Sequence, residues 1–256
     1  MRSVLLAVTA WVALVPAVPA HAAPDPVKAL TAQLASGKGV MVSATIKTAK
    51  NGKTYLISYE KGKVALAPRG VVATDKTLRH RYLGKMDEDD KAIYRPSRQI
   101  VIGKTVYHRG GIWADLLPAG KSWMVRKGFG PSSTHSSIEV LDPRQLRILL
   151  DHATVRRDGM AEGVTTTCQL DGLREATCPY KDDPKITWTL WFNSKGLITR
   201  LVSANDLKLS QVYRTHVDVR FTGWGSTVVI DPPSADQVWD PQEEDTPPDI
   251  LGESNS

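Results

Sequence analysis

Apolar and polar residues alternate with a period of two along much of this chain, which is typical of β-strands with one buried face. Residues 40–47, 186–193 and 213–222 show the alternation most clearly, with an apolar side chain at every second position. A strand with one apolar and one polar face belongs to an antiparallel sheet that is wetted on one side. The pattern therefore predicts a sheet of this kind.

Turn residues divide the alternating stretches into hairpins. Asn51-Gly52 is the strongest hairpin signal, because both residues readily adopt the positive φ that a tight turn needs. Lys61-Gly62 predicts a second turn, between one strand over residues 54–59 and another over 64–67. Further strands are expected at residues 71–79, 99–102, 105–108, 122–126, 153–157, 163–170, 197–203 and 228–230.

Two segments carry apolar side chains at helical spacing, residues 24–36 and 143–152. In the first, Asp25 stands before Pro26, and Asp142 stands in the same way before Pro143. An aspartate cap followed by proline in the first turn is a typical helix start. Many strands with few helices predict an α+β domain in which the helices pack on one face of the sheet.

The first 22 residues predict a secretory signal peptide. Arg2 precedes an apolar run over residues 4–15, and Ala20 and Ala22 provide the small side chains of a cleavage site. The run is shorter than the about 20 residues of a membrane-spanning helix, although an uncleaved anchor is an alternative. No cysteine follows the run, so we expect no lipoprotein anchor. We expect a secreted or extracytoplasmic protein with no transmembrane segment in the mature chain.

The remaining chain predicts one domain over residues 23–239 and a disordered acidic tail over residues 240–256, which is rich in proline and small polar residues. The 33 Lys and Arg residues against 27 Asp and Glu residues give a net charge of +6. This charge is small and spread along the chain, so we expect no nucleic-acid partner.

The only two cysteines, Cys168 and Cys178, flank a predicted turn at Asp171-Gly172. A disulfide between them would close a short loop and stabilise the fold by about 2–3 kcal/mol in the chain-entropy model. Two free thiols, or a redox or metal site, are the alternatives. The spacing is not C-x-x-C and no histidine lies between the cysteines, which favours the disulfide.

Motifs that carry catalytic chemistry are missing from the sequence, which has no G-x-S-x-G, H-E-x-x-H or phosphate-binding glycine pattern. Beyond the predicted signal peptide, the histidines are far apart in sequence: His80, His108, His135, His152 and His216. We therefore expect no enzyme, no cofactor and no metal, although the fold could still bring distant residues together. The serine-rich stretch 132–137 and the acidic stretch 86–91 are interpreted as solvated loops.

Two groups of residues carry a resemblance to a known family. One group is Tyr107, Pro118, Gly120, Lys121 and Trp123, and the other is Gly223, Trp224, Gly225, Pro232, Pro233 and Asp236. Over about residues 25–238 the chain resembles the actinobacterial secreted proteins similar to the mycobacterial LppX/LprG lipoprotein family. More distantly it is similar to the periplasmic lipoprotein carriers LolA and LolB. The missing anchor cysteine departs from the lipoprotein members.

The resemblance implies a strongly curved antiparallel half-barrel with helices on its concave face and an apolar cavity for acyl chains. The residues expected to line this cavity are Trp188, Leu190, Phe192, Val217, Val219, Phe221, Leu146, Leu149 and Leu150. The same residues would equally fill a dry core. The expected function is a non-enzymatic binding protein for a lipid or other amphipathic ligand. The alternative is an extracytoplasmic sensor or protein-interaction module with an envelope protein as partner and no bound lipid.

Overall fold

The alternating stretches form one large sheet in the computed structural model, which describes residues 24–85, 91–128, 130–173, 177–179, 183–208 and 210–244. The strands of the first half are β1 (Lys38–Lys50), β2 (Lys53–Ala67), β3 (Gly70–Tyr82), β4 (Ser97–Ile102), β5 (Thr105–Gly110) and β6 (Trp123–Lys127). Those of the second half are β7 (Ala153–Arg157), β8 (Met160–Thr165), β9 (Ile186–Phe192), β10 (Ile198–Lys208), β11 (Val212–Thr227) and β12 (Val238–Trp239).

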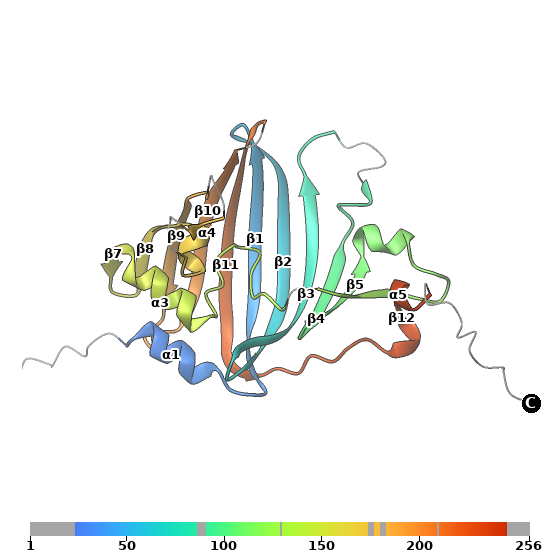
Figure 1. Cartoon of the computed structure of the whole chain (residues 1–256), viewed down its shortest axis with the longest axis horizontal. Coiled ribbons are helices and arrows are strands. Elements are labelled where there is room, and N and C mark those ends of the chain that lie inside the picture. Colours follow the sequence, from blue (N-terminus) through green and yellow to red (C-terminus); the bar gives the residue numbers. More distant parts are fainter. Residues whose placement is uncertain are drawn as a thin grey trace, which may run out of the picture.

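Within the described residues, the twelve strands have the order β12-β6-β5-β4-β3-β2-β1-β11-β10-β9-β8-β7 (Figure 1). All neighbours are antiparallel except β12 and β6, and the sheet does not close into a barrel. β1 joins the two halves of the chain, because it pairs with β2 on one edge and with β11 on the other. The predicted antiparallel sheet is thus confirmed.

Both predicted helices form, as α1 (Pro26–Gln33) and α3 (Pro143–Asp151). Asp25 caps α1, its Oδ1 accepting from the amide of Val27 at 2.9 Å, and Asp142 caps α3 in the same way. The other helical segments of the described residues are η1 (Gly111–Asp115), α4 (Thr167–Leu170), η3 (Ala235–Gln237) and α5 (Pro241–Glu244). α5 lies in the segment predicted as a tail, of which residues 245–256 are outside the described residues, as is the predicted signal peptide.

Three local predictions were wrong. The strand expected over residues 163–170 ends at Thr165, because Thr166 and Gln169 form a capping box that starts α4. The turn expected at Lys61-Gly62 is absent, since β2 runs through it without interruption and pairs with both β1 and β3. Residues 228–230, expected as a strand, are not in one.

The three helices α1, α3 and α4 pack against one face of the sheet over β1 and β8–β11 (Figure 1). Buried residues of α1, such as Leu30, and of α3, such as Leu146, belong to the same hydrophobic cluster as Leu190, Leu201 and Val219 of the sheet. Burying this apolar area is the main stabilising contribution to the fold. We call the face that carries these helices the inner face.

The disulfide between Cys168 and Cys178 is present, which confirms the predicted pairing. It ties α4 to the segment before β9. The carboxylate of Asp183 accepts from the amides of Thr167 and Cys168 at 3.0 and 2.8 Å and so caps the same helix. None of the helices formed by the described residues is long and apolar enough to cross a membrane.

Candidate functional site: a polar basin on the uncovered half of the inner face

The inner face changes character at β1. Ala44 of β1 lies between Val219 of β11 on one side and Glu60 of β2 on the other. From β11 to β8 the inward-facing side chains are mostly apolar and lie under the helices. From β2 to β6 the same register carries polar and charged side chains: Ser58, Glu60, Thr74, Lys76, His80, Gln99, His108 and Arg126. Five of these, Ser58, Glu60, Thr74, Lys76 and His108, are buried.

Gly62 makes room for the centre of this half. It pairs with Lys76 across β2 and β3, and a Cβ at Gly62 would lie 2.8 Å from Cγ of Lys76 and 2.3 Å from the carbonyl oxygen of Asp75. The missing side chain lets the stem of Lys76 lie flat over β2, so that its ammonium reaches Glu60 two residues away. The glycine that resembled a turn residue in sequence therefore serves a packing role.

A loop crosses the inner face between β6 and α3, and we call residues 130–142 the crossing loop (Figure 1). Glu139 holds this loop in shape, because its carboxylate accepts from the Ser133 amide at 2.6 Å and from the hydroxyls of Ser132 and Ser133. Ser136 contacts β10 through the hydroxyl of Ser203, 2.9 Å away. The serine-rich stretch expected to be a solvated loop is thus a hydrogen-bonded element of the inner face.

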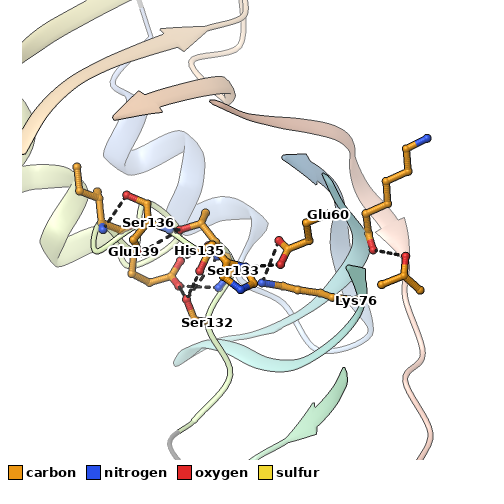
Figure 2. A network of polar contacts seen from close by, with 11 residues as sticks. Glu60, Lys76, Ser132, Ser133, His135, Ser136 and Glu139 are labelled. Atoms are coloured by element: carbon orange, nitrogen blue, oxygen red, sulfur yellow. Dashed lines mark hydrogen bonds and ion pairs between the residues drawn. The ribbon is translucent and has the colours of Figure 1, made fainter. Parts of the chain in front are cut away.

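The crossing loop places His135 on a buried carboxylate. Nδ1 of His135 lies 2.5 Å from one oxygen of Glu60, and Nζ of Lys76 lies 3.4 Å from the other. Figure 2 shows the side chains of His135 and Lys76 directed at this carboxylate. The Glu60 side chain is only 1% exposed and that of Lys76 8%, whereas half of the His135 side chain is exposed.

The charge state of Glu60 follows from these contacts. Burial raises its pKa, but the hydrogen bond from His135 and the positive charge of Lys76 outweigh burial and leave the pKa below its usual value. Glu60 is therefore a carboxylate in the folded protein at neutral pH. A buried ion pair of this kind contributes little net stability compared with apolar packing, because both charges lose their hydration. Its position on an open sheet face therefore points to a role other than stabilisation.

A second buried group lies on β5. Nε of Arg126 donates to Nε2 of His108 at 3.1 Å, and the indole of Trp113 lies 4.9 Å from the imidazole between ring centroids. Burial, and next the charge of Arg126, lower the pKa of His108 to about 4. His108 is therefore neutral at physiological pH and accepts from Arg126, whose guanidinium also lies over the ring of Trp113, 5.3 Å from its centroid.

A hollow of about 330 Å³ lies between the crossing loop and β3–β6. We call it the polar basin. Its lining includes Lys76, Gln99, Arg126 and Lys127 from the strands and Ser132, Thr134 and His135 from the loop, with Val101 and Val106 as an apolar floor. A hollow of this size suits a small ligand or one end of a larger one.

The segments beside the basin carry exposed apolar side chains. Ile112 of η1 is 43% exposed and Leu116, directly after it, is 57% exposed. Ile93, in the connection between β3 and β4, is 52% exposed. Both segments are attached to the uncovered half, because Trp113 contacts His108 and Tyr94 contacts the ring of His80. The uncovered half thus combines a charged centre with apolar surroundings.

The residues expected to line an acyl cavity lie in the other half. All nine belong to or pack against the main hydrophobic cluster under the helices. Leu150 and Phe192 also line a larger hollow of about 870 Å³ between α1, α3 and the turn after β7. Its charged wall is exposed, and Asp25 and Arg156 there already serve the local structure, as the α1 cap and as a donor to the Leu150 carbonyl. Its wall holds no buried charge that would bind a ligand.

The histidines that are distant in sequence divide between the two faces. The fold brings His80, His108 and His135 to the uncovered half, whereas His216 lies on the opposite face of β11 and His152 follows α3. Within the described part of the chain, one group of possible metal ligands is close together, formed by Cys168, Cys178 and Asp183. Its two sulfur atoms are bonded to each other, so this donor set does not fit a metal ion.

A serine–histidine pair is also present, with Oγ of Ser58 2.8 Å from Nδ1 of His80. A nucleophilic serine needs access to substrate and a third group that orients its base. Ser58 is buried, and no carboxylate of the described residues bonds the other ring nitrogen of His80. The pair is better explained as a hydrogen bond between the buried hydroxyl of Ser58 and the half-buried imidazole of His80.

No protein-family model matches the sequence, and the comparison with curated proteins gives no match either. The interpretation of the site therefore depends on its own chemistry.

Proposed function

We propose that this protein is a non-enzymatic, extracytoplasmic binding protein that holds an amphipathic ligand against the uncovered half of the inner face. The polar end of the ligand lies in the polar basin, and its apolar part lies against the exposed side chains of η1 and of the β3–β4 connection. The observation that carries this proposal is the buried Glu60–Lys76 pair on a sheet face without a helix layer over it. Buried charges that do not serve packing are typical of binding sites.

Two further observations support the proposal. A disulfide is typical of proteins outside the cytoplasm, which fits the predicted signal peptide. The resemblance to the LppX/LprG and LolA-like carriers implies lipid binding on the concave face of a half-barrel, and in this proposal the inner face is that concave face. The proposed binding site lies in a different place from the cavity expected from sequence, since the helix-covered half is already filled by side chains.

Native mass spectrometry of protein isolated gently from its source tests the proposal. We expect a bound amphipathic molecule, together with uptake of a fluorescent fatty-acid probe by the emptied protein. Gln99→Trp, which fills the basin and keeps both members of the buried pair, should abolish uptake. Met41→Trp adds the same side chain at an exposed position of the opposite face and should leave uptake unchanged. An empty mass with no uptake would overturn the proposal and favour a sensor or protein-interaction module.

A further inference from the structure

We infer that the group bound in the polar basin is an anion, an acidic oxygen group such as a phosphate, sulfate or carboxylate. The inference rests on the proposed function and adds the chemical class of the ligand. It starts from the charges at the basin wall. Lys76, Arg126 and Lys127 line the hollow, and the imidazole of His135 lies beside them. Glu60, beneath the wall, is the one carboxylate that touches this group in the described residues.

The hydrogen-bond donors of the basin are not used up inside the protein. Arg126 uses its Nε for His108, and among the described residues no acceptor bonds its two terminal nitrogens. The Gln99 amide likewise has no partner there, and Lys127 at the end of β6 adds a further positive charge at the rim of the hollow. Lys76 has one ion pair and keeps further N–H donors. A wall with a surplus of charged donors binds an acidic oxygen group through charge-assisted hydrogen bonds.

Acceptors in the basin are few by comparison. The hydroxyl of Thr134 donates to the Ile138 carbonyl at 3.1 Å, and that of Ser132 donates to Glu139 and to the Thr134 carbonyl. Glu139 itself is occupied by the two serines and by the amide of Leu141. The neutral state of His108 keeps the guanidinium of Arg126 as a donor next to it. A cationic ligand would find three positive charges and no free carboxylate.

Three probes distinguish the possible sources of the anion: dodecyl phosphate, the neutral 1-O-dodecylglycerol, and inorganic phosphate. Each is titrated calorimetrically into the full purified protein, with both amphiphiles kept below micelle formation. We expect dodecyl phosphate to bind about tenfold or more tightly than the neutral amphiphile, since a charge-assisted hydrogen bond contributes about 1.4 kcal/mol or more. Its affinity should fall as salt is raised, because ions screen the attraction.

The double variant Arg126→Gln/Lys127→Gln should weaken dodecyl phosphate about tenfold or more and leave dodecylglycerol unchanged. Arg79→Gln, which removes an exposed cation from the opposite face of β3, should alter neither. Because both altered side chains of the double variant are exposed, its folding should be retained, and its unfolding curve checks this.

Each result separates this inference from the proposed function. Equal affinity for the two amphiphiles would overturn the inference that the bound group is an anion and would leave the proposed binding function intact. Binding of neither amphiphile, and of no phosphate, would overturn both. If inorganic phosphate binds as tightly as dodecyl phosphate, the anion is supported with a free anion as its source, and the amphipathic function is overturned.

Discussion

The two halves of the inner face share one sheet and one register but have opposite chemistry. On the β11 side of β1, Val217, Val219 and Phe221 lie under helices and are 2% exposed or less. On the β2 side, the residues opposite Ala44 and Val42 are Glu60 and Gly62, and Lys76 lies next to Gly62. The helix-covered half forms a core that excludes ligands, whereas the uncovered half has a wall of charges and a hollow.

This difference shows that strand alternation alone does not define a core. A period-two pattern decides which side chains share a face, but what covers that face decides whether they become core. Here no α-helix covers the polar side chains of β2–β6: the crossing loop reaches Glu60 through His135, and Trp113 and Tyr94 lie against His108 and His80. The two halves should therefore respond differently to substitution.

The largest effect is expected in the helix-covered half. Phe221→Ala should lower the free energy of unfolding by about 3–5 kcal/mol, because it removes a large buried side chain and leaves a cavity. Leu116→Ala, at an exposed position beside the polar basin, should change it by less than about 0.5 kcal/mol. Urea denaturation of the two variants measures the contrast. Similar losses for both would mean that the helix-covered half does not dominate stability.

A smaller effect is expected from the buried ion pair. Lys76→Met should destabilise the protein by about 3 kcal/mol, since it leaves the buried carboxylate of Glu60 without its lysine partner. Adding Glu60→Leu to this variant should restore the free energy of unfolding to the wild-type value or above, because apolar side chains pack there without losing hydration.

The combined variant Lys76→Met/Glu60→Leu sharpens the comparison between the halves. It makes the centre of the uncovered half resemble the helix-covered half, so it should keep the fold but lose affinity for dodecyl phosphate. If Lys76→Met/Glu60→Leu is as unstable as Lys76→Met alone, the pair is required for folding. The explanation of the buried charges as a binding device would then fail.

The local features of the fold could be predicted from sequence. Asp25-Pro26 and Asp142-Pro143 start helices because capping depends on neighbouring residues alone, and the disulfide was indicated by the two cysteines. The capping box at Thr166 and Gln169 has an equally local signature, Thr-x-x-Gln, and could have been found. It was missed because β-branched residues before it favoured a strand.

The polar basin could not be predicted in the same way. Its members Glu60, Lys76 and His135 come from β2, β3 and the crossing loop, and only long-range strand register brings them together. One local signal was present, however. Polar residues at period two, such as Ser58 and Glu60, continue the same side of β2 as the apolar Val64. Interpreting Gly62 as a turn hid this continuity.

The smallest effect is expected from the neutral histidine of the uncovered half, His108, and it concerns how the free energy of unfolding depends on pH. The pKa of His108 is about 4 in the folded protein, against an ordinary value of 6.5. As the pH falls below 6.5, the unfolded chain takes up this proton and the folded protein does not, so the free energy of unfolding falls with pH until about pH 4. The loss should be about 2 kcal/mol between pH 7.5 and 4.5.

His108→Gln should remove this component, so the wild-type protein should lose more stability than the variant over the same pH range. Comparing the two proteins cancels the contribution of Glu60, whose lowered pKa also makes stability fall at acidic pH. Arg126→Gln should reduce the component in part, because the charge of Arg126 is the second cause of the shift after burial. Arg79→Gln, on the opposite face, should leave it unchanged. Equal pH dependence in the wild type and in His108→Gln would mean that His108 is protonated in the fold. Arg126 would then lose its acceptor, and two positive charges would face each other beside the basin.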